Sequence, residues 1–236
     1  MRALSILVLL LSAGTALADP VTFPAADGVT IHADYQAAGD EVIVLFHQAG
    51  SSLHEYDPVA PRLNALGYST LAVSQRSGGG YFGGTNATAE GAGGGADYLD
   101  AYPDLEAALA WAKGKGNGVI VWGSSYSASL VFKLAAEHPG DVAAVLSFSP
   151  GEYFGSGLSV SDAAAQVRAP VFVTSASDGG EVAAAKEIIS AVPGAKTQFV
   201  PNHGTHGAST LREDQNPRGV KENWAAVEAF LGGVRQ

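Results

Sequence analysis

Three serines lie close together where the apolar run of VIVWGSSYSASLVF, residues 119–132, gives way to a helix-like pattern. A nucleophile on a sharp strand-to-helix turn needs small residues two positions before and two positions after it, because the turn brings those positions together. Centring the turn on Ser125 pairs Gly123 with Ser127, which are both small. Centring it on Ser124 would pair a tryptophan with a tyrosine, and centring it on Ser127 would move it into the helix. Ser125 is therefore the predicted nucleophile.

The same segment also allows a purely structural interpretation. Ser124 or Ser125 could serve only to cap the following helix, since serine is a preferred N-cap residue. On this segment alone, a cap and a nucleophile are about equally supported. In the catalytic interpretation Ser124 is expected to be a bystander, and its replacement by alanine should leave most of the activity.

A candidate acid follows the predicted strand at residues 170–174. That strand leads through small residues to Asp178, and a carboxylate at the carboxyl end of a strand can orient an imidazole and stabilise its cation. Asp178 could instead cap the predicted helix at residues 181–191. Glu152, which follows the preceding strand, is the alternative acid.

Two histidines follow the last predicted strand, in the segment FVPNHGTHGAST. Small, flexible residues flank His206, so we favour His206 over His203 as a general base. A metal site built from both histidines lacks nearby acidic ligands, and we expect neither a metal nor an organic cofactor.

A serine nucleophile also needs two backbone N–H groups that stabilise the negative oxygen of the transition state. One belongs to the residue after the nucleophile, here Tyr126. The other usually comes from a loop after an early strand, and Gln48 lies in that position in LFHQAGSSLHEY. His47 is expected to fix this loop through hydrogen bonds rather than to act as a base.

Apolar β-rich runs alternate along the chain with helical stretches rich in alanine and leucine. This alternation is typical of βαβ units and predicts an α/β fold, a mostly parallel sheet with helices on both faces. The expected strands lie at residues 29–35, 41–46, 68–73, 118–122, 143–148, 170–174 and 197–200. The expected helices lie at residues 57–67, 104–113, 125–137, 181–191 and 220–231.

A glycine-rich segment without hydrophobic periodicity, residues 76–103, stands apart from this alternation. Long loops of this kind are often functional lids. The connection at residues 149–169 is short, which leaves little room for a helical cap. No change of composition marks a second domain, so residues 19–236 are expected to form a single domain.

The first 18 residues have the pattern of a cleaved export signal. They contain one arginine near the start, an apolar run at residues 4–11 and an Ala-Leu-Ala cleavage site that ends at Ala18. The apolar run is shorter than the roughly 20 residues that a membrane-spanning helix needs. We therefore expect a mature chain of 218 residues that begins at Asp19 and is exported, either to the periplasm or out of the cell.

The mature chain would carry 12 basic and 23 acidic residues, a net charge of −11, because cleavage removes Arg2. A strongly negative chain is a poor partner for nucleic acid or for an anionic membrane. The sequence contains no cysteine, which excludes a cysteine nucleophile and cysteine-bound metals.

With nucleophile, acid and base in this chain order, the sequence resembles the α/β-hydrolase superfamily, and within it the small, capless dienelactone-hydrolase-like and esterase-like members. The similar segments are HQAGSS as the oxyanion loop, GYSTLAVSQRSGGG before the glycine-rich loop, GSSYS as the elbow, and SASD and GTHG around the acid and the base. The resemblance implies a serine hydrolase that cleaves a small-molecule carboxylic ester through an acyl-enzyme on Ser125, His206 and Asp178.

Three positions depart from the pattern of that family. Ser127 replaces the second glycine of the elbow, serine replaces the cysteine nucleophile of dienelactone hydrolases proper, and Gln48 replaces a glycine found in a related group of lipases. With a minimal cap, the pocket walls are expected to come from residues 77–96 and 150–154. Tyr153 and Phe154 would line an acyl or alcohol site suited to small or short-chain esters.

Three other functions stay open at this point. A peptidase or amidase could use the same three residues. An exported binding protein could keep the fold without catalysis. A protein associated with carbohydrate or with the cell envelope could use its glycine-rich loop for protein contacts.

Overall fold

The computed structural model describes residues 18–235. The predicted signal peptide, residues 1–18, lies outside the described residues except for Ala18. The strands are β1 Asp19–Pro24, β2 Thr30–Gln36, β3 Glu41–Phe46, β4 Ser69–Ser74, β5 Gly118–Ser124, β6 Val142–Phe148, β7 Val171–Thr174 and β8 Lys196–Gln198. The α-helices are α1 Ala60–Ala65, α2 Ala87–Gly91, α3 Tyr102–Lys113, α4 Tyr126–Glu137, α5 Val160–Ala164, α6 Gly179–Ala191 and α7 Val220–Val234. Four short 3-10 helices are η1 Leu53–Tyr56, η2 Leu99–Ala101, η3 Gly155–Gly157 and η4 Gly207–Leu211.

All eight strands join one sheet in the order β1-β2-β4-β3-β5-β6-β7-β8. β1 and β2 pair antiparallel, as do β2 and β4, and every later pairing is parallel. Parallel strands end at the same edge of a sheet, so the loops that follow β3, β5, β7 and β8 gather at that edge. The predicted α/β fold with a mostly parallel sheet is confirmed.

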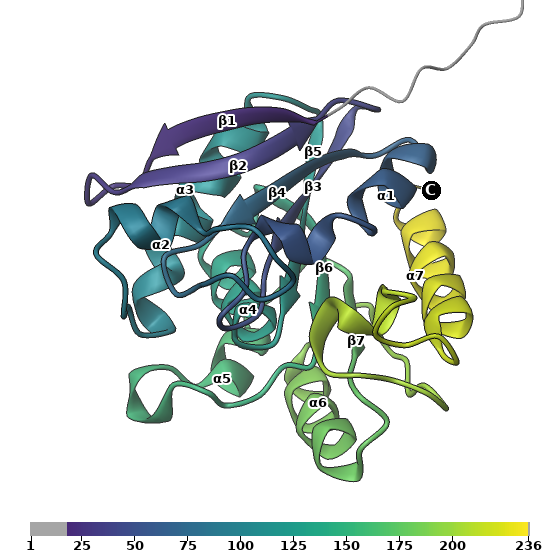
Figure 1. Cartoon of the computed structure of the whole chain (residues 1–236). Helices are drawn as coiled ribbons and strands as arrows, with labels where there is room; N and C mark the ends of the chain where they lie inside the picture. Colours follow the sequence, from purple (N-terminus) through teal and green to yellow (C-terminus); the bar gives the residue numbers. More distant parts are fainter. Residues whose placement is uncertain (1–17, 236) are drawn as a thin grey trace, which may run out of the picture.

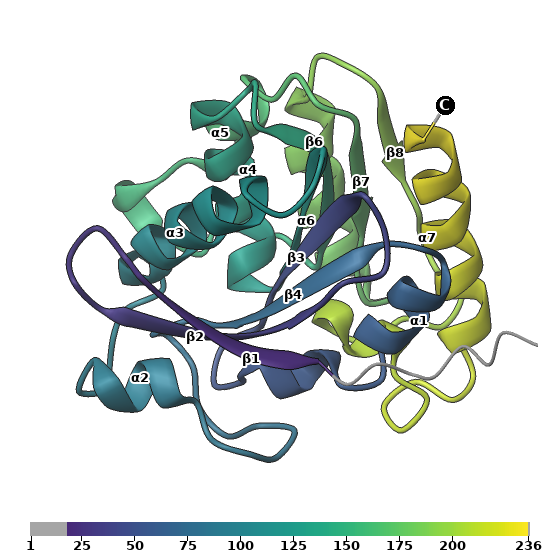
Figure 2. The same cartoon turned by 90° about the horizontal axis from the view of Figure 1, so that it is seen from above.

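Helices cover both faces of the sheet (Figures 1 and 2). Seen from above, α3, α4, α5 and α6 lie on one side of the sheet, and α1 and α7 lie on the other. Among residues 18–235, no helix has the length and apolar character needed to cross a membrane.

The central strands are apolar on both sides because each side meets a helical layer. In β3, Val42, Val44 and Phe46 belong to the core under α3 and α4. The alternating residues Ile43 and Leu45 belong to the core under α1 and α7. Two packed cores of this kind fix the positions of the strand ends.

One strand and two α-helices of the described residues were not expected from the sequence. β1 lies on the antiparallel edge of the sheet, and its two prolines weaken the strand pattern. α2 lies within the glycine-rich segment, where Asn86 caps its first turn by accepting from Ala89 N at 2.9 Å. α5 lies in the connection after β6. The short helices α2 and α5 have little periodicity to reveal them.

Candidate active site

Ser125 occupies a sharp turn between β5 and α4. Its backbone has φ 61° and ψ −121°, a strained conformation for a residue with a side chain. A Cβ added to Gly123 would lie 2.3 Å from the carbonyl oxygen of Ser127, so only glycine fits two positions before the turn. The Ser127 hydroxyl is small enough to fit as well, and it donates to Phe46 O at 2.7 Å. The local geometry is that of a nucleophile elbow centred on Ser125.

The Ser125 hydroxyl is the first member of a chain of three polar side chains. His206 Nε2 lies 2.8 Å from Ser125 Oγ, and His206 Nδ1 lies 2.8 Å from Glu181 Oε1. A histidine that donates from Nδ1 to a carboxylate presents a free Nε2 lone pair to the serine. The structure thus brings together two of the three residues predicted from the sequence.

Asp178, the predicted acid, is not in this chain and the prediction needs correction. Its side chain caps α6 by accepting from Gly180 N at 2.9 Å and Glu181 N at 3.4 Å. Glu181, in the first turn of the same helix, is one methylene longer and reaches the imidazole instead. Glu152, the alternative acid, accepts from Val160 N at 2.7 Å at the start of α5.

The sequence carries a signal for a helix N-terminus here, but that signal does not say which of the two carboxylates reaches His206. Asp178 and Glu181 have the spacing of a capping residue followed three positions later by glutamate, a pattern that marks a helix N-terminus. Glu181 Oε2 accepts from Ala176 N at 3.1 Å, which folds the glutamate back over the turn before the helix. His203 lies apart from the site, where its backbone N–H donates to Glu222 Oε1 at 2.7 Å.

The protonation of Glu181 and His206 suits a base held by a carboxylate. Burial acts to raise the pKa of Glu181, but hydrogen bonds from His206, the Ser149 hydroxyl and Ala176 N outweigh it and lower the pKa to about 2. The hydrogen bond to Glu181 raises the pKa of His206, partly offset by burial. The carboxylate is therefore ionised at any ordinary pH, and it stabilises an imidazolium at His206.

The loop after β3 is fixed by His47, as expected from the sequence. His47 Nε2 accepts from Gln75 N at 2.8 Å, so its Nδ1 carries the proton that it donates to Gln48 O, also at 2.8 Å. Burial lowers the pKa of His47 to about 4, which keeps the ring neutral. His47 is a structural residue of this loop.

Gln48, the predicted oxyanion donor, has its backbone N–H committed elsewhere. It donates to Glu55 Oε2 at 2.7 Å. Because the Gln48 carbonyl points to His47, the N–H of the same peptide unit, which belongs to Ala49, points the opposite way. Within residues 18–235, neither Ala49 N nor Tyr126 N has a hydrogen-bond acceptor. Of the two neighbouring residues, Ala49 is therefore the one whose N–H is free.

Ser124 is not the bystander that the sequence suggested. It is fully buried, its hydroxyl donates to Glu55 Oε1 at 2.6 Å, and its oxygen accepts from Ala208 N at 2.8 Å. Replacement by alanine would leave both partners without this contact. The alanine variant is therefore expected to behave differently from the unaltered protein.

An open hollow of about 530 Å³ lies over Ser125 and His206, and it is also lined by Gln48, Ala49, Gly50, Tyr81 and Tyr98. Tyr98 stacks on Tyr126 with ring centroids 4.8 Å apart. Of the expected walls, residues 77–96 supply Tyr81, whereas residues 150–154 do not line the hollow; Tyr98, from the end of the glycine-rich segment, was not expected there.

The two predicted substrate-binding residues take different positions. Tyr153 is partly exposed and donates to Ser149 O at 2.9 Å. Burial, together with the charge of Glu181, raises the pKa of Tyr153, and the residue does not line the hollow over Ser125. Phe154 packs against the core under α3 and α4 instead, and it does not line the hollow.

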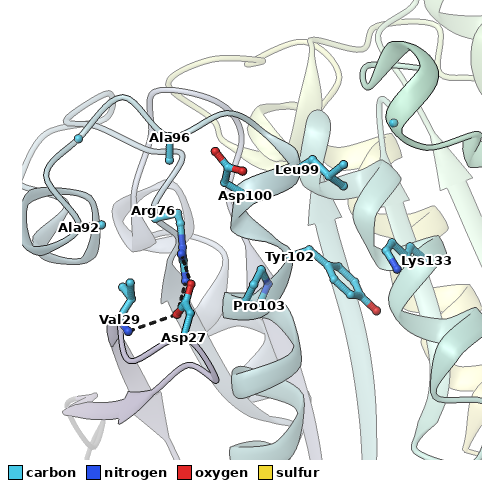
Figure 3. A pocket seen from close by; sticks show the side chains of 12 residues that line it. Asp27, Val29, Arg76, Ala92, Ala96, Leu99, Asp100, Tyr102, Pro103 and Lys133 are labelled. Atoms are coloured by element: carbon cyan, nitrogen blue, oxygen red, sulfur yellow. Dashed lines mark hydrogen bonds and ion pairs between the residues drawn. The ribbon is translucent and has the colours of Figure 1, made fainter.

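A second hollow of about 540 Å³ lies between the β1–β2 turn and α3 (Figure 3). Arg76 crosses its base, donating to Asp27 and, through Nε at 2.9 Å, to the fully buried Asp104. Burial raises the pKa of Asp104, whereas the exposed Asp27 has its pKa lowered by the Arg76 hydrogen bond. Four hydrogen bonds hold the guanidinium on these two carboxylates, so the cluster anchors the start of the glycine-rich segment.

No group of three His, Asp or Glu side chains in the described part of the chain is placed to hold a metal ion. The arrangement at Ser125 consists of a hydroxyl, an imidazole, a carboxylate and two free amides. It can remove a proton from the hydroxyl and hold a negative oxygen close by.

No protein-family model and no curated protein matches the sequence. Solved structures do match the fold. An esterase of Pyrococcus furiosus is 18% identical, with a TM-score of 0.71 over 93% of this chain and 91% of that one. A dienelactone hydrolase of Anabaena variabilis is 17% identical, with a TM-score of 0.71 over 92% and 96%. Est1E of Butyrivibrio proteoclasticus is 14% identical, with a TM-score of 0.66 over 93% and 99%.

Proposed function

Because the chain has the α/β-hydrolase fold, we propose that it is a serine hydrolase that cleaves carboxylic esters. The observation that carries the proposal is the line of contacts from Ser125 Oγ through the His206 imidazole to the Glu181 carboxylate, each 2.8 Å long. The esterases and the dienelactone hydrolase of similar fold support the same class of reaction.

The proposed reaction has two steps on Ser125. His206 Nε2 accepts the proton of the hydroxyl as Ser125 Oγ attacks the acyl carbon, and the protonated imidazole then gives that proton to the departing alcohol. Glu181 holds the ring through Nδ1 and stabilises the imidazolium. Water, activated by the same imidazole, releases the acid from the acyl-enzyme.

The negative oxygen of each tetrahedral intermediate would lie between the amides of Ala49 and Tyr126. Tyr126 N belongs to the first turn of α4, where free amides and the helix dipole favour negative charge. One such donor is typically worth roughly 10²–10³ in kcat. An Ala49→Pro variant has no backbone N–H at position 49 and therefore tests the role of this amide directly.

Small or short-chain esters suit the site best. The hollow over Ser125 is open to solvent on one side, so its walls do not enclose a long acyl chain. Tyr81 and Tyr98 present partly exposed rings at its rim, which favour an apolar or planar group on one side of the ester. Est1E, which was also solved with ferulic acid bound, is a reason to include an aromatic acyl ester among the substrates tested.

The test is stoichiometric labelling by a fluorophosphonate probe, followed by hydrolysis of p-nitrophenyl acetate. The unaltered protein should be labelled once, at Ser125, and Ser125→Ala should lose both labelling and turnover. Ser156→Ala, which removes an exposed hydroxyl in η3, is the matched control and should keep both. Ester turnover that persists in Ser125→Ala, or an unlabelled native protein, would refute the proposal. Parallel assays with acyl p-nitroanilides separate an esterase from an amidase.

A further inference from the structure

Glu55 is a fully buried carboxylate outside the Ser125–His206–Glu181 chain. It lies in η1, and none of its surface is exposed. Its two oxygens accept from neutral donors, Gln48 N at 2.7 Å and Ser124 Oγ at 2.6 Å. The nearest guanidinium, that of Arg212, donates to the backbone oxygen of Glu55 at 2.9 Å instead of pairing with the carboxylate. A buried carboxylate without a paired cation is costly, so its retention calls for a role.

The contacts of Glu55 reach all three loops that carry the proposed catalytic groups. Gln48 directly precedes Ala49, and Ser124 directly precedes Ser125. The Ser124 oxygen also accepts from Ala208 N at 2.8 Å, two residues after His206. One continuous hydrogen-bonded path therefore runs from the oxyanion loop through Glu55 and Ser124 to the histidine loop.

We infer that Glu55 is a positioning residue, whose carboxylate holds the oxyanion loop, the nucleophile elbow and the histidine loop in the one arrangement that the reaction needs. This inference rests on the proposed function for its kinetic consequence. Glu55 contacts no substrate and acts through Gln48 and Ser124.

The packing around Ser124 leaves this arrangement little freedom. A Cβ on Gly207 would lie 2.4 Å from Ser124 Oγ and 3.0 Å from Gln48 Oε1, and Gly207 has φ +67°. The histidine loop therefore lies directly against both residues that contact Glu55. A shift of either contact moves His206 or the Ala49 amide, and displacements of about 1 Å in an active site can cost roughly 10²-fold in rate.

The charge state of Glu55 should matter to this role. Burial raises the pKa of Glu55 to about 7, opposed by the hydrogen bonds from Ser124 and Gln48 and by the charges of Arg212 and His206. Tyr56 and Tyr126 also face the carboxylate, and burial raises the pKa of both well above 10, so they stay neutral.

Protonation would change the hydrogen bonds of Glu55 in a definite way. Both partners donate to the carboxylate at present, and of the two only the Ser124 hydroxyl can also accept. Between these two partners an added proton is satisfied only if the Ser124 hydrogen bond reverses, and the Ser124 proton then needs another acceptor. The ionised carboxylate accepts from Gln48 N and from Ser124 Oγ at the same time, so it is the state that connects all three loops.

The experiment compares the unaltered protein with Glu55→Gln, which mimics the neutral acid. For p-nitrophenyl acetate we expect kcat to fall by roughly 10- to 100-fold with KM changed less than about 3-fold. Between pH 5 and 9 the unaltered protein should need two deprotonations for full kcat/KM, at His206 and Glu55, and the variant only one. Hydrogen exchange of the Gln48 and Ala208 amides should become faster in the variant, and thermal unfolding verifies that it remains folded.

Asp57→Asn is the matched control, since Asp57 is an exposed carboxylate two residues away that contacts His54. It should leave kcat, the pH profile and the exchange rates unchanged. A Glu55→Gln protein that keeps the kcat, the two-step pH profile and the amide exchange of the unaltered protein would overturn the inference. If the fluorophosphonate probe does not label Ser125 in the native protein, the proposed hydrolase function is wrong. Hydrogen exchange of the Gln48 and Ala208 amides in Glu55→Gln would still decide whether Glu55 holds the loops.

Discussion

The Glu181 carboxylate accepts hydrogen bonds from an imidazole and from a backbone amide, and its pKa is lowered to about 2. Such a carboxylate is held in one orientation and remains ionised, which is what a histidine base requires of its partner. Asp178, three residues earlier, performs the separate task of satisfying the free amides at the start of α6. The two carboxylates can therefore be distinguished by experiment.

We predict that Glu181→Gln lowers kcat for p-nitrophenyl acetate by roughly 10²–10⁴-fold, because the amide can hold the wrong imidazole tautomer and no longer stabilises its cation. Asp178→Ala should keep kcat within about 3-fold and lower the stability by about 1 kcal/mol, the typical value of a lost N-cap. Steady-state kinetics and thermal unfolding of the two variants check this. The reverse result, with Asp178→Ala the impaired enzyme, would restore the assignment made from the sequence.

The activity should rise with pH through the titration of His206. The imidazole can accept the serine proton only when neutral, and the hydrogen bond to Glu181 raises its pKa above the usual 6.5. The acid limb of kcat/KM should therefore have its midpoint above pH 6.5, and Glu181→Gln should move that midpoint toward lower pH. A pH–rate profile between pH 5 and 9 measures both. An acid limb centred well below pH 6 would contradict this assignment of the base.

At the scale of the secondary-structure elements, the sequence predicted the strands and helices that carry the site, but it missed β1, α2 and α5. The strand at residues 41–46 is found with the expected bounds. An uninterrupted apolar run bounded by polar residues is typical of a strand that is buried on both faces of a parallel sheet. The nucleophile could be placed because the sizes of the flanking residues exclude the neighbouring Ser124 as the centre of the turn. The acid could not, since Asp178 and Glu181 lie on one turn and only the three-dimensional path of the loop decides which reaches His206. Glu55 could not be recognised either, because nothing local shows that it is buried.

The glycine-rich segment is anchored at its start by Arg76, which we expect to be important for stability. Arg76→Lys cannot contact Asp27 and Asp104 simultaneously with the same geometry, and it leaves the buried Asp104 charge poorly paired. We expect a loss of about 3–5 kcal/mol, equivalent to a decrease in Tm of roughly 6–20 °C for a chain of this size.

Arg62→Lys is the control for that measurement. Arg62 and Glu228 form an exposed ion pair on α1 and α7 that should be worth less than about 1 kcal/mol. Thermal and urea unfolding of both variants provide the comparison. Equal stability of the two variants would show that the buried cluster does not anchor the segment.

At the scale of the whole molecule, the first strand of the described residues begins where we expect the signal peptide to be removed. β1 starts at Asp19, which pairs with Tyr35 of β2. Cleavage after Ala18 would therefore leave the sheet complete. Export itself is a proposal that rests on the sequence of residues 1–18.

We predict that the protein recovered from outside the cytoplasm begins at Asp19. Mass spectrometry of its N-terminal peptide measures this. Ala18→Arg should block processing, because the residue before the cleavage site must be small, whereas Ala25→Arg lies beyond the site and should not. Normal processing of the Ala18→Arg chain would exclude this cleavage site.

The two ends of the sheet have a consequence for how the molecule behaves in crowded solution. β1 includes Pro20 and Pro24, which have no N–H to offer an incoming strand, and β8 is only three residues long. The long, apolar strands lie between them under helices on both faces. Neither edge is a good template for fibril growth, and the net charge of about −10 repels copies from one another. A concentrated solution should therefore remain free of cross-β aggregates as long as the helical layers stay folded.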